Sequence, residues 1–293
     1  MKLNIQAAFE DTPPELDFVW PGLLAGTVGA LIAPGGVGKS FWALQVAISV
    51  ATGGSAPDLI DLRTDKARKV IYLAAEDPGD ILRLRLHAIG KDLSRSERIL
   101  ANKWLSVIPI AGTSIDVMSE KHRAKIVQDS EGGRLIILDT LSRFHQLDEN
   151  SNSEMAQLLR SLESVAAKAG SAVLFLHHSS KSGIRDGYID QQHSARGASS
   201  LIDNARWCGY MVPMTERESN SLSETPLGNR PICPTNRKRF IRFGVSKQNY
   251  GARPDDRWYK RNDDGLLSPV QLFPISPKKS KTNKSKAAND YSG

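Results

Sequence analysis

The stretch that most constrains the fold is Ala33-Pro34-Gly35-Gly36-Val37-Gly38-Lys39-Ser40. It lies between an apolar run at 28–32 and a helix-like stretch at 41–51. A glycine-rich loop that joins a strand to a helix and ends in Lys-Ser is the pattern of a phosphate-binding loop. Its glycines let successive backbone N–H groups surround a phosphate, and the N-terminus of the following helix adds partial positive charge. We therefore expect a nucleotide-binding α/β domain.

The positions of this loop have distinct expected roles. Lys39 should reach the β- and γ-phosphates of ATP, and the hydroxyl of Ser40 should bind Mg²⁺. Ala33 stands where the simplest pattern has glycine, at a position that only begins the turn. The alternative is a glycine-rich turn that binds nothing, which the flanking strand and helix disfavour. The residues expected to contact the nucleotide are Gly35, Gly36, Val37, Gly38, Lys39, Ser40 and Phe41.

Apolar runs typical of buried strands alternate with helix-like stretches along the chain. This alternation predicts a parallel sheet with right-handed crossovers. The late strands should extend the sheet in a partly antiparallel way, so the expected fold class is α/β with a mostly parallel central sheet. We expect early strands at 28–32, 69–75, 105–110, 134–140 and 172–176, helices at 40–52, 94–102, 119–129, 153–169 and 199–206, and late strands at 207–213, 240–245, 258–260 and 266–270.

The composition is ordinary for a globular protein with one core. The chain has 293 residues, of which 40% are hydrophobic and 24% are charged. Its two cysteines, Cys208 and Cys233, indicate neither a metal cluster nor a disulfide framework, which fits a reducing cytoplasm. No stretch resembles a secretion signal or approaches about eighteen apolar residues. We therefore expect a cytoplasmic protein without a membrane span.

The two ends of the chain differ from its middle. Residues 1–22 contain Pro13-Pro14 and a few apolar residues, which predicts an extended arm that docks elsewhere, with a neighbouring subunit as one candidate. We expect the main domain at 23–273 and a disordered basic tail at 274–293. The lysines of this tail contribute to a net charge of +7, which is compatible with a polyanionic partner but does not identify one.

Polar residues follow three of the predicted strands, and ligands bind where the carboxyl ends of parallel strands meet. Asp139 is expected to bind Mg²⁺, with a helix N-cap as the alternative. Glu76 is expected to act as a general base, and Asp77 is its rival for that role or a cap for the next helix. His178 is expected to sense the γ-phosphate, while its neighbour His177 fits a core residue.

Two later segments are polar. Residues 179–196 contain almost no large apolar side chain, which predicts a mobile loop beside the site. Residues 219–236 contain three prolines, which predicts a surface excursion. Only His193 lies near the pair His177-His178 in sequence, and no zinc-ligand spacing is present, so zinc is not expected.

Taken in order, Lys39-Ser40, Glu76, Asp139 and His178 resemble the RecA-type motor core shared by DnaB-like helicases and recombinase ATPases. The chain more closely resembles the RepA-type hexameric replicative helicases of small mobilisable broad-host-range plasmids. This resemblance extends from about residue 5 to about residue 269. The stretches that carry it are AGTVGAL at 25–31, VIYLAAEDP at 70–78, LDTLSRFH at 138–145, FLHH at 175–178 and FGVSKQNYG at 243–251.

The resemblance implies a RecA-like P-loop core and a homohexameric ring, with ATP between subunits and single-stranded DNA through the middle. In such a ring, we expect the loop at 179–196 to line the pore and to grip the DNA backbone through Lys181 and Arg185. The alternative is a loop at the surface without a DNA contact.

The resemblance also directs attention to an arginine that acts on the neighbouring subunit. DnaB-like helicases place a Lys-x-Arg pair near their late strands, whereas this chain has Lys247 and Asn249 there, so the arginine is missing. The Arg-Trp of the plasmid helicases maps to Arg206, which is therefore the expected arginine finger. The alternative for Arg206 is a structural ion pair with Asp203 or another acid. Other candidates for the finger are Arg85, Arg143 and Lys247.

The leading functional hypothesis is an ATP-dependent DNA helicase that serves plasmid replication. Its cofactors would be ATP and Mg²⁺, and its partners would be single-stranded DNA, further copies of the chain, and a plasmid replication initiator or primase. One alternative is a RecA-like accessory or recombination ATPase that does not unwind DNA. Another is an ATP-switched DNA-binding regulator, which is weakened because the sequence shows neither a helix-turn-helix nor an aromatic stacking platform.

Overall fold

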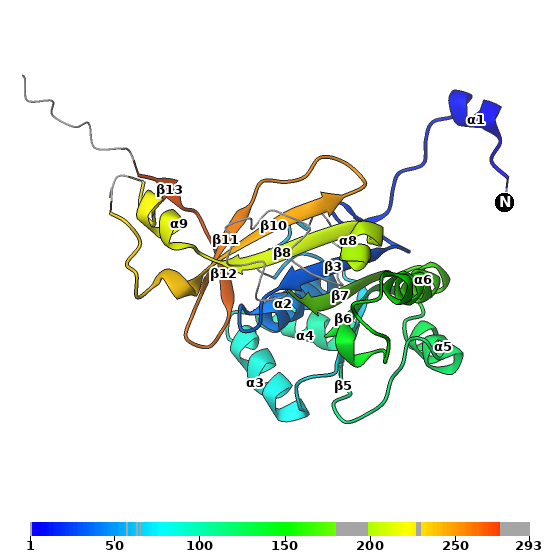
Figure 1. Ribbon diagram of the computed structural model, residues 1–293, viewed down its shortest axis with the longest axis horizontal. Helices are drawn as coiled ribbons and strands as arrows, with labels where there is room; N and C mark the ends of the chain where they lie inside the picture. The colour runs from blue at the N-terminus through cyan, green and yellow to red at the C-terminus, as the bar shows by residue number, and fades with distance from the viewer. Residues whose placement is uncertain are drawn as a thin grey trace, which may run out of the picture.

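The computed structural model describes residues 2–56, 58–62, 64, 66–179, 199–226 and 230–275. The predicted DNA contacts Lys181 and Arg185 lie outside the described residues, as does nearly all of the predicted basic tail. Over the described ranges, the chain forms a large mixed sheet with helices on both faces (Figure 1).

Among the described residues this sheet has nine strands, in the order β12-β11-β10-β8-β3-β7-β6-β4-β5. The six strands from β8 to β5 run parallel, and β10, β11 and β12 continue the sheet with antiparallel pairs. This arrangement confirms the predicted fold class. The strands are β3 (Val28–Ala33), β4 (Lys69–Ala74), β5 (Leu105–Pro109), β6 (Gly133–Asp139), β7 (Ala172–His178), β8 (Trp207–Pro213), β10 (Phe240–Gln248), β11 (Arg257–Arg261) and β12 (Leu267–Val270).

Helices cover both faces of the sheet because the central strands are apolar on both sides. Side chains of β4 alternate between the two faces: Tyr72 packs on the side of α2, while Ile71 and Leu73 pack on the side of α6. One face is covered by α2 (Lys39–Thr52), α3 (Gly79–Gly90) and α4 (Arg95–Trp104), and the other by α5 (Glu120–Asp129), α6 (Asn152–Ala169) and α8 (Ser199–Asn204).

The two longest helices show how sequence determines packing. In α6, the apolar side chains from Met155 to Val165 recur at helical spacing and are buried against the sheet, as predicted. Ser151 caps its start by accepting a hydrogen bond from the backbone N–H of Glu154. In contrast, α2 is apolar around almost its whole circumference and is buried nearly throughout. It therefore forms the centre of one face and holds the glycine-rich loop at its N-terminus.

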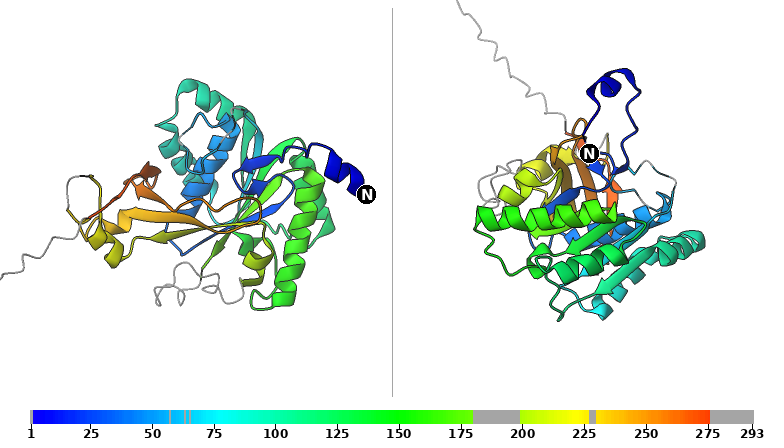
Figure 2. Two further views of the ribbon diagram at one scale, coloured as in Figure 1. Left: turned by 90° about the horizontal axis from the view of Figure 1, so that it is seen from above. Right: turned by 90° about the vertical axis from the view of Figure 1, so that its right-hand side faces the viewer.

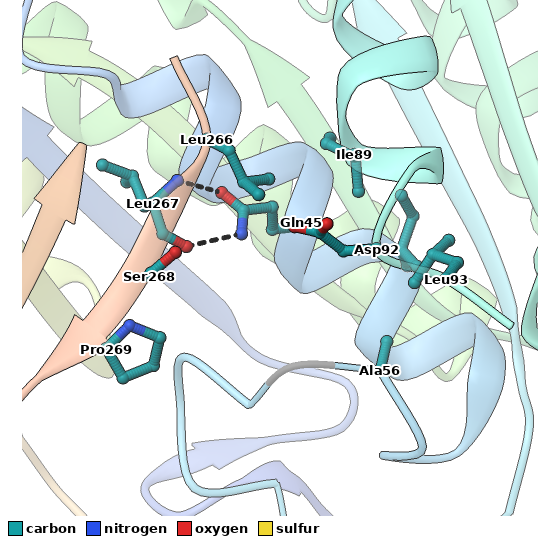
Figure 3. A pocket seen from close by; sticks show the side chains of 10 residues that line it. Gln45, Ala56, Ile89, Asp92, Leu93, Leu266, Leu267, Ser268 and Pro269 are labelled. Carbon is teal, nitrogen blue, oxygen red and sulfur yellow. Dashed lines mark hydrogen bonds between the residues drawn. The ribbon is translucent and has the colours of Figure 1, made fainter. Parts of the chain in front are cut away.

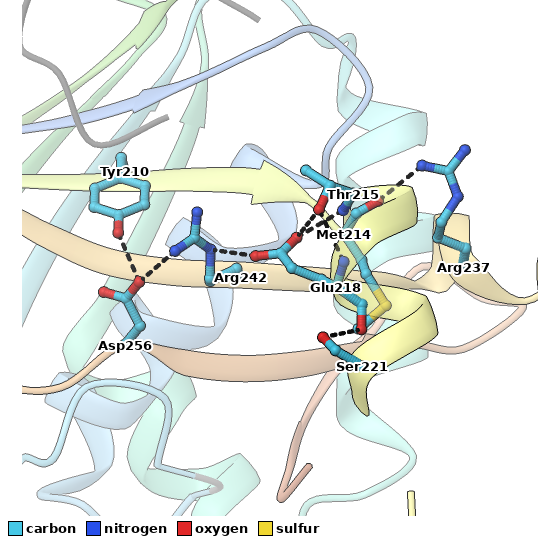
Figure 4. Close-up of polar contacts among 8 residues, drawn as sticks. All are labelled: Tyr210, Met214, Thr215, Glu218, Ser221, Arg237, Arg242 and Asp256. Carbon is cyan, nitrogen blue, oxygen red and sulfur yellow. Dashed lines mark hydrogen bonds and ion pairs between the residues drawn. The ribbon is translucent and has the colours of Figure 1, made fainter. Parts of the chain in front are cut away.

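The antiparallel extension is fastened by a group of half-buried polar side chains (Figure 4). Arg242 on β10 pairs with Glu218 at 3.2 Å and with Asp256 at 2.9 Å. Tyr210 on β8 donates a hydrogen bond to Asp256 at 2.8 Å. Because Glu218 belongs to α9 (Glu216–Ser221), these contacts tie α9 to the sheet.

Most described residues of the segment at 219–236 are exposed, as expected of the predicted surface excursion, but a few buried residues anchor it to the body. Ser219 and Ile232 are buried, and the backbone N–H of Ile232 donates to the carbonyl of Ser219. Ile232 packs with Met214 and Phe240 in a small separate apolar cluster. The short strands β9 (Leu222–Ser223) and β13 (Phe273–Pro274) pair beside it, a long-range contact that local sequence patterns do not reveal. The 3₁₀ turn η3 (Arg237–Arg239) leads from it into β10.

The N-terminal arm differs from the expected extended segment at its start, while its end docks on the body as expected. Its first part forms a short helix, α1 (Ile5–Glu10), which buries none of its residues and projects from the body of the protein (Figure 2). Its last part belongs to the body, because β1 (Phe18–Trp20) pairs with β2 (Leu23–Leu24) and buries Val19 and Trp20.

Candidate nucleotide-binding site

The glycine-rich loop lies at the carboxyl edge of the sheet, between β3 and α2. Gly36 and Gly38 adopt φ angles of 78° and 104°, a region that other residues rarely enter. A Cβ atom added at Gly35 or Gly36 would meet nothing within 4 Å, so the space above the loop is open. The loop therefore has the backbone shape and the free space that a phosphate group requires.

Lys39 lies beneath this space and is almost fully buried. Burial lowers the pKa of Lys39, while the charges of Asp139 and then Glu76 partly oppose that shift. The ammonium group is thus largely removed from water and lies near two carboxylates. An anionic phosphate at the open loop would add a further negative charge that stabilises this buried cation.

Asp139 ends β6 and is also buried. The hydroxyl of Tyr72 donates a hydrogen bond to one of its carboxylate oxygens at 2.6 Å, and the hydroxyl of Thr140 lies 3.1 Å from the other. Burial and then the charge of Asp139 raise the pKa of Tyr72 well above its ordinary value, so the phenol remains a donor. A buried carboxylate at the carboxyl end of β6 is an oxygen ligand that suits Mg²⁺.

Glu76 and Asp77 follow β4 but have different partners. The Nε2 atom of His178 lies 3.5 Å from Oε1 of Glu76. Asp77 instead forms an ion pair of 2.5 Å with Arg85 of α3. Parallel pairing of β3 with β7 sets His178 beside Ala33, at the start of the glycine-rich loop. Glu76 and His178 therefore lie at the same edge as Lys39, while Asp77 is held by an arginine.

His177 differs from its neighbour His178 in exposure. His177 is buried, and burial is the main cause that lowers its pKa. His145, which follows the 3₁₀ turn η1 (Leu141–Arg143) after β6, also has its pKa lowered chiefly by burial. This agrees with the expectation that one member of the His177-His178 pair is a core residue.

The hairpin between β11 and β12 packs against the loop and the start of α2. Arg261 donates a hydrogen bond to the carbonyl of Gly36 at 2.8 Å. A Cβ at Gly265 would overlap the ring of Phe41, whose face is covered by the guanidinium of Arg85. Phe41 is therefore clamped between this hairpin and α3.

Deeper in the same junction, the side-chain amide of Gln45 bonds both backbone groups of Leu267, at 2.8 and 3.0 Å (Figure 3). These bonds fasten β12 to α2. The cavity beside them, of about 50 Å³, is lined mainly by apolar side chains and is too small for a nucleotide. The open space above the glycines is thus the better candidate for the ligand.

Arg206 lies at the opposite edge of the sheet. Its backbone N–H donates to the carbonyl of Val28, the first residue of β3, which ends at the glycine-rich loop about 17 Å further on. Its carbonyl accepts a hydrogen bond from Asn249 at 3.1 Å. Its guanidinium is half-exposed and lies 4.0 Å from Glu163, so the predicted alternative of an ion pair is present, with an acid other than Asp203. Arg206 is therefore adjacent to Asn249, the position at which the resemblance predicted an arginine.

Three contacts at the site were missed in the sequence interpretation. Tyr72 contacts Asp139, Arg85 holds Asp77, and Arg261 contacts the loop. Only Tyr72 had a recognisable signal, because it is the one hydroxyl in an otherwise apolar run. The contact of Arg261 joins residues 225 positions apart, which no local pattern predicts.

The described residues show neither a metal cluster nor a membrane span. Within the ranges that the structure covers, no three His, Cys, Asp or Glu side chains are grouped as metal ligands. In those same ranges, no helix has both the length and the apolar character to cross a bilayer.

Solved structures with a similar fold include an ATPase domain and a helicase. One structure, described as an ATPase domain, matches with a TM-score of 0.60 and 13% identity, over 91% of this chain and 96% of that chain. A DnaB-like replicative helicase, described together with its interactions with primase, matches with a TM-score of 0.59 and 13% identity, over 91% of this chain and 65% of that chain. At this identity the likeness concerns the fold, which is that of RecA-like P-loop ATPases.

A family model provides a direct assignment by sequence. The model described as "AAA domain" (AAA_25) matches residues 2–183. That range contains the glycine-rich loop, Glu76, Asp139 and His178, and it covers more than half of the chain. The chain therefore belongs to the AAA domain family AAA_25.

Proposed function

We propose that this protein is an ATP-dependent DNA helicase that works as a homohexameric ring in plasmid replication. The observation that supports this most is the grouping of Lys39, Asp139 and Glu76 around the open glycine-rich loop. A cation, a metal-binding acid and a candidate base at one sheet edge are the groups that phosphoryl transfer to water requires. The helicase-like fold and the resemblance to plasmid helicases support the choice of DNA as the partner.

The roles of the phosphate-binding groups follow from their surroundings. Backbone N–H groups from Gly35 to Ser40 would bind the β-phosphate, and Lys39 would bind the γ-phosphate oxygens. Mg²⁺, held by Asp139 and the Ser40 hydroxyl, would neutralise charge on the phosphates. Tyr72 positions Asp139, since its hydrogen bond fixes one carboxylate oxygen.

Glu76 would accept a proton from the attacking water, because its carboxylate is not engaged by an arginine as that of Asp77 is. His178, 3.5 Å from Glu76, would bond the γ-phosphate and report its loss to the segment that follows β7. That segment carries Lys181 and Arg185, which we propose as contacts to the DNA backbone. Binding through such cations should weaken with salt and show little sequence preference.

Arg206 would act on ATP held by an adjacent copy. Its distance from the loop of its own chain excludes it from that site. Its half-exposed guanidinium at the opposite edge would exchange its contact with Glu163 for the phosphates of a neighbouring ATP. The carbonyl of Arg206 accepts a hydrogen bond from the backbone N–H of Asn249. Asn249 stands where DnaB-like helicases have the arginine of their Lys-x-Arg pair, so Arg206 lies beside that position. A cation supplied in this way can raise the rate about 10³-fold or more.

The test is strand displacement on a forked DNA duplex, measured with ATP and Mg²⁺. We expect the wild type to displace the strand and Lys39→Ala to fail while remaining folded. ATP hydrolysis that is stimulated by DNA without displacement would instead favour the accessory or recombination ATPase. DNA binding that depends on ATP without turnover would favour the regulator. Either of these results would refute the helicase proposal.

A further inference from the structure

We propose that Arg261 is a positioning residue for the glycine-rich loop, because its hydrogen bond to the carbonyl of Gly36 turns the backbone N–H of Val37 towards the β-phosphate of the nucleotide. This inference deepens the proposed function and rests on the binding of ATP at this loop. It concerns how the loop is shaped, so it can fail while ATP hydrolysis and DNA unwinding hold.

The first half of the loop has little in its own residues to fix its shape. Gly35 and Gly36 are exposed, and a Cβ atom at either position would meet nothing within 4 Å. Gly36 has a φ angle of 78°, and glycine adopts positive and negative φ angles about equally readily. A peptide group beside such a residue can turn over with little steric hindrance. A contact from outside the loop is therefore needed to hold it in one orientation.

Arg261 makes such a contact. Its Nη1 atom donates a hydrogen bond of 2.8 Å to the carbonyl of Gly36, 225 positions away in the sequence. This carbonyl and the N–H of Val37 belong to one peptide group, which is trans, so the two point in opposite directions. While the carbonyl faces Arg261, the N–H of Val37 faces away from the β11–β12 hairpin. It is then free to join the loop N–H groups that would surround a phosphate.

The hairpin that carries Arg261 is fastened to the helix that follows the loop. Arg261 lies opposite Leu267 in the antiparallel pairing of β11 with β12. The side-chain amide of Gln45 on α2 bonds both backbone groups of Leu267, at 2.8 and 3.0 Å (Figure 3). The turn between the strands is closed by Asn262, whose side chain accepts a hydrogen bond from the N–H of Leu266 at 2.8 Å. Arg261 therefore reaches the loop from a fixed position.

The guanidinium of Arg261 is not committed to an acid. On the same strand, Arg257 lies 3.7 Å from Asp61, and Lys260 pairs with Glu224. No carboxylate of the described chain forms an ion pair with the half-buried Arg261. A hydrogen bond from a charged donor is stronger than one between neutral groups. The bond to the Gly36 carbonyl therefore has a strong donor for which no acid competes.

A role in orienting the N–H of Val37 predicts a particular pattern of binding. The β-phosphate is present in both ATP and ADP, so loss of this orientation should weaken both nucleotides. The contact exists in the bound substrate as well as in the transition state. Loss of an interaction made equally in both states raises KM and leaves kcat unchanged. A residue that touched only the γ-phosphate would instead affect ATP alone.

The experiment titrates wild type and Arg261→Ala with ATP and with ADP, in the presence of Mg²⁺, by calorimetry. We expect the Kd of both nucleotides to rise about tenfold or more, the effect of one hydrogen bond from a charged group. In steady-state hydrolysis, KM should rise by a similar factor, while kcat should change less than about threefold. The midpoint of denaturant unfolding should stay at the wild-type value, because the side chain is only half-buried.

Further variants separate hydrogen bonding from packing. Arg261→Lys should restore both Kd values to within about threefold of wild type, since an ammonium group can also donate to the carbonyl. Arg261→Met keeps an apolar stem without a donor and should behave like Arg261→Ala. The matched control is Arg257→Ala, which removes an arginine from the same face of the same strand, at a position paired with Asp61. It should leave both Kd values within about twofold of wild type.

Wild-type affinity of Arg261→Ala for ADP would overturn the inference, as would a loss for ATP alone. A loss that Arg261→Lys does not rescue, together with a lower unfolding midpoint, would show that Arg261 only stabilises the hairpin and would overturn the inference too. A wild type that binds neither nucleotide would contradict both this inference and the proposed function. A wild type that binds both, with the expected losses in Arg261→Ala, but does not unwind DNA would contradict the proposed function alone.

Discussion

Replacement of Tyr72 by phenylalanine isolates one buried hydrogen bond at the proposed Mg²⁺ site. The hydroxyl of Tyr72 donates to Asp139 at 2.6 Å, and both side chains are almost completely buried. The substitution keeps the ring, and with it the packing of β4 against α2. It therefore removes one bond to an ionised acceptor, which contributes about 1.5–3 kcal/mol to the free energy of unfolding.

The same change should weaken the response to Mg²⁺. A residue that orients a metal ligand typically affects metal affinity by about 10- to 100-fold. We expect the Mg²⁺ concentration for half-maximal ATP hydrolysis to rise by about that factor in Tyr72→Phe. The matched control is Tyr259→Phe, because the Tyr259 hydroxyl is also buried and bonds the carbonyl of Leu59, away from the site. The control should lose stability but keep the wild-type response to Mg²⁺.

The stability difference should also depend on pH in a defined direction. Burial and the charge of Asp139 raise the pKa of Tyr72 above its ordinary value of 10, so above about pH 10 the unfolded chain loses this proton while the folded chain keeps it. The stability that this tyrosine contributes is present below pH 10 and decreases as the pH rises further. Denaturant unfolding should therefore show the deficit of Tyr72→Phe shrinking above pH 10. An equal Mg²⁺ response in both tyrosine variants would refute the assigned role of Tyr72.

Two further predictions concern acid stability and the neighbouring copy. Burial lowers the pKa of His177, so below about pH 6.5 the unfolded chain binds a proton that the folded chain resists. The unfolding free energy of the wild type should thus decrease as the pH falls from 7 to 5. In His177→Gln this decrease should be smaller, and an equal decrease in both proteins would contradict the role given to His177. Arg206→Ala copies and Lys39→Ala copies, each inactive alone, should recover part of the ATPase rate when mixed, because some interfaces then hold both intact residues. No recovery despite verified mixing would exclude Arg206 as the finger.

The central part of the fold was predictable because its signals are local. The glycine-rich loop with its flanking strand and helix, the apolar runs of β4, β6 and β7, and the helical spacing in α6 each depend on residues within one element. Burial on both faces of a parallel sheet leaves little choice of side chain, so these runs are easily recognised. Polar residues after the runs then identify Glu76, Asp139 and His178 as neighbours at one edge.

Features that depend on distant contacts were not predictable. The polar group of Arg242 with Glu218 and Asp256 joins three separate segments, and the pairing of β9 with β13 joins strands about fifty residues apart. Likewise, the role of Arg261 depends on where the hairpin after β11 meets the loop. The short helix α1 was not predicted, because Pro13 and Pro14 favour an extended conformation for the arm.

The central claim is that Glu76, together with the loop that carries Lys39, turns over ATP at the carboxyl edge of the sheet. It is tested most directly by measuring ATP binding and ATP hydrolysis on the same preparations of wild type, Glu76→Gln and Asp77→Asn. We predict that Glu76→Gln binds ATP with near wild-type affinity and hydrolyses it at least about 10²-fold more slowly, while Asp77→Asn retains turnover. Near wild-type hydrolysis by Glu76→Gln together with loss of turnover in Asp77→Asn would contradict the claim.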